Sequence, residues 1–341
     1  MKRMHHGSLC LSALSLMARN ASAADSQDAL MPFGVQAAHI HDLWQVLLWA
    51  CMVFGVLIVI AVTVALWRAP RSSETTPAEP TPGLHTLSQY VVTGALVVSI
   101  IGLLGLTVAS VMTDRALAGL SEERPVNVKI TSHNWWWEIT YEDAQPSRTF
   151  MTANELHIPA GRPVIATLES DDVIHSFWVP NLHGKRDLIP GRTAKIKFRA
   201  DSPGSYRGQC AEFCGYQHAH MALLVIAEPA EAYEKWADRQ RASANTPAEE
   251  QKKHGESLFL SSRCAMCHSI QGTSANGKVA PDLTHVGSRR YIAAGTLLNG
   301  PSQLAAWISD PQRYKPGANM PGTTFSSEDL QALVTYLQSL T

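Results

Sequence analysis

The chain has 341 residues and carries 28 lysines and arginines against 29 aspartates and glutamates, a formal net charge of −1. A net charge this close to zero gives no argument for nucleic-acid binding by the molecule as a whole, so we expect no nucleic-acid partner. The length allows two or three domains. Charged residues are unevenly distributed, and the first third of the chain contains two long stretches without any.

Residues 1–24 are predicted to be a signal peptide. Lys2 and Arg3 form a positively charged start, a short apolar run follows over residues 9–17, and Ala-Ser-Ala ending at Ala23 offers a small-residue cleavage site. Cys10 precedes most of the apolar run rather than following it, which argues against a lipid anchor at this position.

Residues 25–117 are predicted to form a transmembrane hairpin. The stretches 43–67 and 87–112 carry no charged residue. At about 1.5 Å per residue, each helix would span roughly 37–39 Å, more than the ~30 Å hydrocarbon core of a bilayer. Tryptophans near the ends of the first stretch suit the interfaces. We therefore expect both helices to cross a lipid membrane.

Residues 118–242 are predicted to form a β domain that ends in a helix. Apolar and polar residues alternate over residues 126–130 and 195–198, and Pro-Gly turn signals recur. Short strands at this spacing favour an antiparallel sandwich or a Greek-key barrel. Residues 229–242 predict the helix, with proline near its first turn. Residues 243–247 predict a short linker.

The segment Cys210-Ala-Glu-Phe-Cys214-Gly-Tyr-Gln-His218-Ala-His-Met221 places two thiols, two imidazoles and a thioether within twelve residues. These donors suit copper in electron-transfer sites. The cysteine spacing differs from the C-x2-C of structural zinc sites. Two thiolates also exceed what one blue copper needs, so we expect a second copper sharing both sulfurs. His175 is the candidate for the further imidazole, and a Cys210–Cys214 disulfide is the alternative.

The sequence Cys264-Ala-Met-Cys267-His268 is the covalent attachment motif of a c-type haem. The thiols bond the haem, and the adjacent histidine ligates the iron from one face. Met320, between two prolines, is the only later methionine and the candidate for the sixth ligand. His285 is the competing sixth ligand. A redox dithiol or half of a zinc site is the alternative for the whole motif.

The six cysteines are accounted for without a structural disulfide. Four belong to the two motifs above, Cys10 lies in the predicted leader, and Cys51 lies in the first membrane stretch, where a thiol behaves as a small hydrophobic group. The consecutive residues Trp135, Trp136 and Trp137 cannot all face one side of a strand, because side chains alternate. At least one of them is therefore expected at an interface or exposed.

The copper segment resembles the binuclear copper (CuA) loop of cytochrome c oxidase subunit II. The resemblance implies a cupredoxin Greek-key barrel for residues 118–242, and it gives the copper site six ligand residues: His175, Cys210, Glu212, Cys214, His218 and Met221. Glu212 would act through its backbone carbonyl, while its carboxylate would reach a magnesium ion at the subunit I interface. Trp135 matches the position where electrons enter, and His220 has no role in the family.

Residues 248–341 resemble an all-α class I cytochrome c. Together the resemblances imply the electron-accepting subunit of a haem–copper terminal oxidase, in which electrons pass from cytochrome c through haem c and CuA to subunit I. Subunit I then reduces O2 to water, coupled to proton translocation, and this chain holds no catalytic residue. The expected partners are subunit I, subunit III and cytochrome c or a similar donor.

Because c-type haem is attached outside the cytoplasm, we expect the copper and haem domains on the periplasmic side of a bacterial inner membrane. One position departs from the family, which often has a glutamate at the start of the second helix. Ser88 is the nearest match here, so a proton path through this subunit is in doubt. The alternatives are the donor subunit of a CuA-containing nitric oxide reductase and a free membrane-anchored electron carrier.

Overall fold

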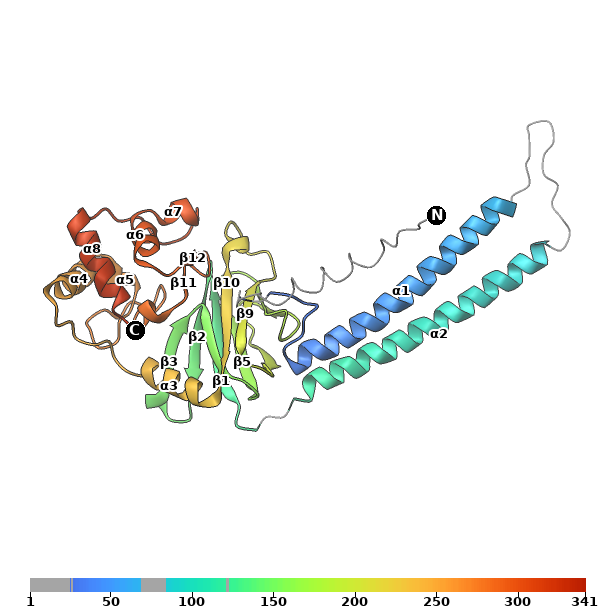
Figure 1. The fold of residues 1–341 in the computed structure, drawn as a ribbon, viewed down its shortest axis with the longest axis horizontal. Helices are drawn as coiled ribbons and strands as arrows, with labels where there is room; N and C mark the ends of the chain where they lie inside the picture. Colours follow the sequence, from blue (N-terminus) through green and yellow to red (C-terminus); the bar gives the residue numbers. More distant parts are fainter. Residues whose placement is uncertain (1–24, 26, 69–83, 121–122) are drawn as a thin grey trace, which may run out of the picture. The chain divides into compact units, whose positions relative to one another are not determined.

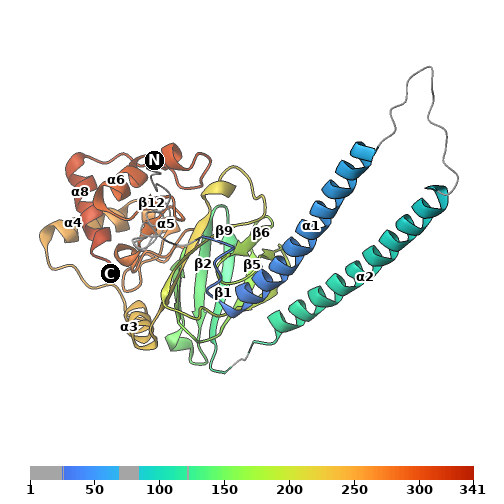
Figure 2. The same cartoon turned by 45° about the vertical axis from the view of Figure 1, so that its right-hand side comes forward.

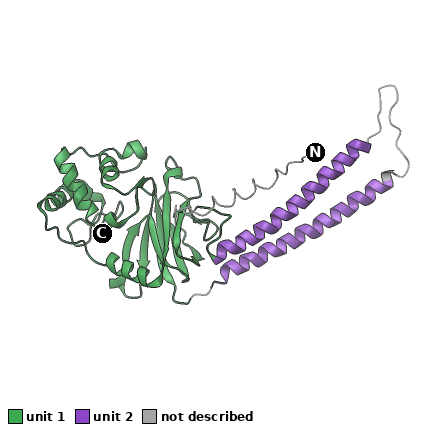
Figure 3. Ribbon diagram, viewed as in Figure 1, with its two compact units in different colours: residues 1–34, 122–341 green, residues 35–121 purple. Residues whose placement is uncertain are grey.

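The computed structural model describes residues 25, 27–68, 84–120 and 123–341. The predicted signal peptide, with Cys10, lies outside the described residues. The chain divides into two compact units, one formed by residues 35–121 and the other by the remainder (Figure 3). Each unit is described by itself.

Two long helices, α1 (Val35–Arg68) and α2 (Leu84–Ala118), run side by side as a hairpin (Figures 1 and 2). Their most apolar 18-residue windows have mean hydropathies of 2.8 and 2.4, and none of either window is buried. Both helices are thus long and apolar enough to span a membrane, as predicted. They exceed the uncharged stretches because helical hydrogen bonding continues into the more polar residues at the helix ends.

The β domain is a sandwich of two five-stranded sheets. The first has the order β3-β2-β1-β5-β8, and the second has the order β4-β10-β9-β6-β7. The strands of the first sheet are β1 (Val126–His133), β2 (Trp136–Glu142), β3 (Phe150–Ala153), β5 (Val164–Ser170) and β8 (Ala194–Phe198). Those of the second are β4 (Glu155–Pro159), β6 (His175–Trp178), β7 (Arg186–Leu188), β9 (Gly204–Cys210) and β10 (Ala222–Glu228).

Alternating side chains from both sheets form one core, which includes the fully buried Trp137, Ile139, Leu168 and Val225. The predicted sandwich is confirmed, but its sheets are not purely antiparallel. Strand β1 pairs with β5 in parallel, and β4 pairs with β10 in parallel. The reason is that the chain crosses to the second sheet at β4 before it returns to the first at β5. Helix α3 (Ala230–Gln240) follows β10 and packs Trp236 against this core.

The C-terminal part is helical, as predicted. Its helices are α4 (Glu250–Ser261), α5 (Cys264–Cys267), α6 (Pro301–Ser309), α7 (Pro311–Tyr314) and α8 (Ser327–Gln338), with a small hairpin of β11 (Tyr291–Ile292) and β12 (Leu297–Leu298). Helices α4 and α8 cross at Gly255, where an added Cβ would lie 2.2 Å from the carbonyl oxygen of Ala332. Only glycine permits this close approach of the two helices, which pack around a second hydrophobic core in the C-terminal part.

Candidate metal centres

The predicted copper donors meet at the ends of three neighbouring strands. His175 is the first residue of β6 and Cys210 is the last residue of β9. The loop between β9 and β10 carries the remaining donors and ends at Met221. The carbonyl of Met221 accepts the N–H of Cys210 at 2.9 Å. Phe177 of β6 pairs with Cys210 in the ladder. The sheet register therefore brings residues that lie 35 positions apart in the sequence to one site.

The two sulfurs lie at the centre of this group. The Sγ atoms of Cys210 and Cys214 are 3.7 Å apart. His175 Nδ1 lies 3.8 Å from Cys210 Sγ, and His218 Nδ1 lies 3.7 Å from Cys214 Sγ. Met221 Sδ lies 4.0 Å from Cys214 Sγ. The arrangement places one imidazole beside each sulfur and a thioether on one side, a donor set that suits copper.

The alternative of a disulfide does not describe this structure. A disulfide requires a sulfur–sulfur distance of about 2.05 Å, and Cys210 and Cys214 are both buried free thiols. The Cys214 thiol hydrogen-bonds to Cys210 and lowers the pKa of the Cys210 thiol, against the opposing effect of burial and with further lowering from His175. The same contact raises the pKa of Cys214. Cys210 therefore deprotonates readily to a thiolate, and a bound cation would favour deprotonation of Cys214 as well.

Asp172 orients the histidine that joins the site from β6. Its Oδ1 lies 2.7 Å from Nε2 of His175, which leaves Nδ1 directed at the sulfurs. Burial alone would lower the pKa of His175, but hydrogen bonds with Asp172 and Cys210 raise it. Asp172 also accepts the backbone N–H of Asn134 at 2.6 Å. One carboxylate thus fixes both a candidate ligand and the start of the tryptophan run, as partners of metal-binding histidines do.

The backbone carbonyl and the carboxylate of Glu212 make different contacts. Its carbonyl oxygen lies 3.2 Å from Cys210 Sγ and so faces the sulfurs. Its carboxylate points the other way and pairs with Lys185 at 3.0 Å. His220, by contrast, hydrogen-bonds to the side chain of Gln217 at 2.8 Å and is exposed.

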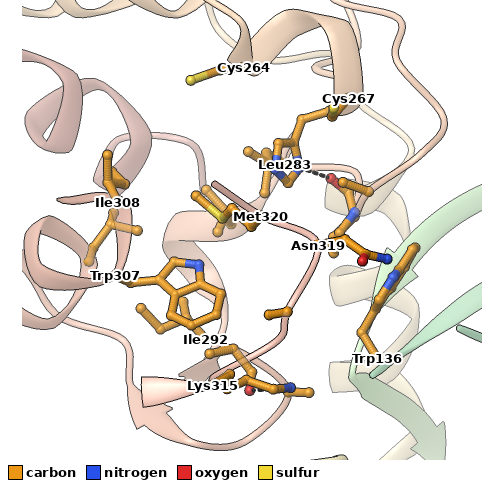
Figure 4. A pocket seen from close by; sticks show the side chains of 18 of the residues that line it. Trp136, Cys264, Cys267, Leu283, Ile292, Trp307, Ile308, Lys315, Asn319 and Met320 are labelled. Atoms are coloured by element: carbon orange, nitrogen blue, oxygen red, sulfur yellow. Dashed lines mark hydrogen bonds between the residues drawn. The ribbon is translucent and has the colours of Figure 1, made fainter. Parts of the chain in front are cut away.

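A partly open cavity of about 630 Å³ is lined mainly by the C-terminal part (Figure 4). Its wall is mainly apolar and includes Phe259, Leu304, Ile308, Leu333 and Leu337. All five belong to the second hydrophobic core or its helices. A large apolar cavity of this size suits a flat organic cofactor.

The residues of the predicted haem motif line this cavity. Cys264 and Cys267 lie in α5 at its edge, and Met320 faces them from the loop after α7 (Figure 4). His268 Nδ1 donates to the carbonyl of Pro281 at 2.7 Å, which leaves Nε2 free for a metal. Burial lowers the pKa of His268 and favours the neutral ring that a metal needs. The competing ligand, His285, instead directs Nε2 to the carbonyl of Ala242 at 3.0 Å.

Two buried polar atoms of the cavity wall have no hydrogen-bond partner among the described residues: Nε of Arg289 and Oδ1 of Asn134. Burial also lowers the pKa of Arg289. A buried guanidinium with an unused donor suits an anionic group such as a carboxylate. The residues present therefore fit a haem, which pairs an apolar ring with carboxylates.

The copper domain forms one wall of the same cavity. Asn134, Trp135, Trp136 and Asn154 line it together with the haem-motif residues. Trp137 is fully buried in the core of the sandwich and does not line the cavity. The three tryptophans therefore do not share one face, although Trp135 precedes β2 and strand alternation applies only from Trp136 onward. Trp135 Nε1 donates to the carbonyl of Cys214 at 2.8 Å. Trp135, which matches the family's electron-entry position, thus lines the cavity and also contacts the copper segment.

Sequence reasoning missed Asp172, Arg289 and Lys315. Asp172 carried a usable signal, because an acidic residue three positions before a candidate ligand can reach its ring. Arg289 and Lys315 carried none, because neither lies in a recognisable motif. Arg289 is identified by its place in the cavity wall, and Lys315 by its hydrogen bonds to the carbonyls of Trp135 and Ala293.

Two family models match the chain: "Cytochrome C oxidase subunit II, periplasmic domain" over residues 144–228 and "Cytochrome c" over residues 253–341. Cytochrome c oxidase subunit 2 of Alkalihalophilus pseudofirmus is 32% identical over 335 residues, covering 97% of this chain and 96% of that protein. The Bacillus subtilis protein of the same name is 31% identical over 233 residues, covering 65% of this chain and 64% of that protein. A solved periplasmic domain of subunit II from Bradyrhizobium japonicum is 26% identical, with a TM-score of 0.33 over 36% of this chain and 97% of that one. The chain therefore belongs to the cytochrome c oxidase subunit 2 family, as the electron-accepting subunit of a haem–copper oxidase with a cytochrome c domain at its C-terminus.

Proposed function

We propose that this chain receives electrons from a cytochrome c or similar donor at residues 248–341 and passes them to its copper domain, residues 118–242, and then to subunit I. The observation that carries this order is the shared cavity wall. Trp135 lines the haem cavity and donates to the carbonyl of the candidate ligand Cys214. An electron leaving the cavity through this wall arrives directly at the copper donors.

Each proposed residue has a distinct task. Cys264 and Cys267 would anchor a haem covalently, and His268 and Met320 would ligate its iron. For copper, His175, Cys210, Cys214, His218 and Met221 supply side-chain donors and Glu212 supplies its carbonyl oxygen. Haem and copper, when bound, supply one-electron redox chemistry. The protein holds the donors rigidly and excludes water.

The proposal also includes the membrane and the neighbouring subunits of the complex. We also propose a multi-pass anchor in the bacterial inner membrane, which the two long apolar helices support. The copper and haem domains would lie on the periplasmic side, which the match to a periplasmic-domain family supports. Subunits I and III are the proposed neighbours. A magnesium ion at the subunit I interface would need ligands from that subunit, because within this chain the carboxylate of Glu212 pairs with Lys185.

Metal and haem analysis of the full-length chain tests the proposal. We expect two coppers and one covalently attached haem per chain. One copper per chain would contradict the binuclear site, and the absence of covalent haem would contradict the use of Cys264 and Cys267. Copurification of a subunit that reduces nitric oxide instead of oxygen would favour the nitric oxide reductase alternative, and copurification of none would favour a free carrier.

A further inference from the structure

A lysine is buried where the haem and copper domains meet. The side chain of Lys315 is in the loop between α7 and Met320, and the residue is only 3% exposed. Its ammonium donates to the carbonyl of Trp135 at 2.8 Å and lies 3.3 Å from the carbonyl of Ala293. Trp135 belongs to the copper domain and Ala293 to the haem domain. One side chain therefore joins backbone from both domains.

Burial of this ammonium is costly. Within residues 123–341, the recorded partners of Lys315 Nζ are carbonyl oxygens, and no carboxylate forms an ion pair with it. Burial lowers the pKa of Lys315 to about 7, with a smaller opposing effect from Cys214. An apolar residue at this position would avoid the penalty for desolvating a charge. The position therefore uses the donor capacity of lysine, not only its apolar stem.

The contact reaches both metal sites. On one side, Trp135 Nε1 donates to the carbonyl of Cys214 at 2.8 Å, so the hydrogen-bonded chain ends on a candidate copper ligand. On the other side, Gln312 holds the loop that follows Lys315 through the carbonyls of Ala318, at 2.8 Å, and Met320, at 3.1 Å. Movement of Lys315 would therefore be transmitted to the proposed iron ligand.

A second contact joins the same loop to the copper segment. Gln217 Nε2, next to the candidate ligand His218, donates to the carbonyl of Pro316 at 2.8 Å. Other interdomain contacts include the N–H of Ala222, next to the candidate ligand Met221, which donates to the carbonyl of Ala294 at 3.0 Å. The carboxylate of Glu155 also accepts the backbone N–H groups of Arg290 and Tyr291 at 2.6 and 3.1 Å. The haem domain is thus held at several points, and Lys315 is the buried charged side chain among them that bonds the backbone of Trp135.

We propose that Lys315 is a positioning residue that holds the Met320 loop against Trp135 and so fixes the separation between the haem and copper sites. The inference rests on the proposed transfer from the haem domain to the copper domain. It adds the residue that keeps the geometry of that transfer constant, because a small displacement between reacting groups has a large effect on rate.

The test uses the full-length, metal-loaded chain within its oxidase complex. Lys315→Met removes the donors and keeps an unbranched apolar side chain, while Lys315→Arg keeps a charged donor. Lys253→Met is the matched control, because Lys253 lies on α4 and pairs with Glu250 of the same helix. Hydrogen–deuterium exchange of peptides covering residues 131–137 and 315–320 reports on position, and rapid photoreduction of the haem reports on the first-order rate of its reoxidation by copper.

For Lys315→Met we expect faster exchange in both peptides and transfer slowed on the order of tenfold. Lys315→Arg should recover part of both effects, and Lys253→Met should match the wild type. If Lys315→Met has the same hydrogen–deuterium exchange and the same haem reoxidation rate as the wild type, the proposal is overturned. A slower rate with unchanged exchange would also overturn it, because the effect would then come from the redox potentials. If Lys315→Met fails to incorporate haem or copper, Lys315→Gln, which keeps one amide donor, is judged by the same two measurements.

The outcome separates this inference from the proposed function. If the wild type shows no haem reoxidation coupled to copper reduction, the proposed order of transfer fails. If the wild type transfers and Lys315→Met is indistinguishable from it, only the positioning role fails.

Discussion

The indole nitrogen of Trp135 donates a 2.8 Å hydrogen bond to the carbonyl oxygen of Cys214. Gly215, the next residue, has φ +107°, and an added Cβ would lie 3.1 Å from the indole ring. The copper loop therefore passes close under Trp135 only because a glycine is present at the turn. Since Trp135 also lines the haem cavity, its ring lies between the two proposed centres.

Replacing Trp135 with phenylalanine should slow transfer between the two domains. The change removes the N–H that holds the indole on Cys214 but keeps an aromatic ring. We expect full copper and haem content and a haem-to-copper rate reduced on the order of tenfold, because the altered ring no longer fixes the path. Flash photoreduction measures the rate. Trp236→Phe, in helix α3, is the control, and an equal slowdown there would attribute the effect to general loosening of the domain.

A thiolate and the thioether of the copper loop should differ in importance. Cys214→Ser removes a candidate bridging thiolate, and we expect it to abolish the binuclear spectrum. Met221→Leu removes a thioether that contributes a long, weak bond, so we expect both coppers to remain, with a shifted spectrum and potential. Copper analysis and electron paramagnetic resonance check both variants. Complete copper loss in Met221→Leu with retention in Cys214→Ser would reverse the assignment.

Met320→Ala should open the haem iron to external ligands. Met320 faces the haem motif across the cavity (Figure 4), and methionine ligation raises the potential of a haem. We expect a lower midpoint potential, carbon monoxide binding to the reduced protein, and loss of the thioether charge-transfer absorption. His285→Ala is the paired variant and should leave all three unchanged. An unaltered spectrum in Met320→Ala would reassign the sixth ligand.

His157 should make the stability of the copper domain depend on pH. Burial alone would lower the pKa of His157, but hydrogen bonds with Glu155 and Glu228 raise it above the usual 6.5. A raised folded-state pKa stabilises the fold below about pH 6.5, and this contribution is lost as the pH rises through the folded-state pKa. His157→Gln should therefore lower the melting temperature most at acidic pH, with a difference that shrinks as the pH rises. Thermal unfolding from pH 5 to 8 measures it, and a difference that grows with pH would contradict the assignment.

The sequence was sufficient for features that depend on local spacing. The thiols and imidazoles of the copper loop, the C-x-x-C-H motif and the two apolar stretches each predict a structure from neighbouring residues, and the fold class they imply is confirmed. The parallel pairing of β1 with β5 was not predictable, because it depends on where the chain changes sheets.

Contacts between the domains were likewise beyond sequence reasoning. Lys315 and Trp135 are 180 positions apart, and nothing in either segment indicates that they meet. The residues expected to be a short flexible linker also make specific contacts. Ala244, for example, donates its N–H to the carbonyl of Gln271 at 2.9 Å. Such contacts depend on how two folded surfaces fit together, and a one-dimensional pattern does not contain that information.

The central claim is that electrons pass from the haem domain to the copper domain within one chain. Flash photoreduction of the haem in the purified full-length protein, repeated over a range of protein concentrations, tests it most directly. The account predicts that haem reoxidation and copper reduction proceed at the same first-order rate, independent of concentration, because the interface holds the two sites together. A rate that rises in proportion to protein concentration would show that transfer occurs between chains and would contradict the account.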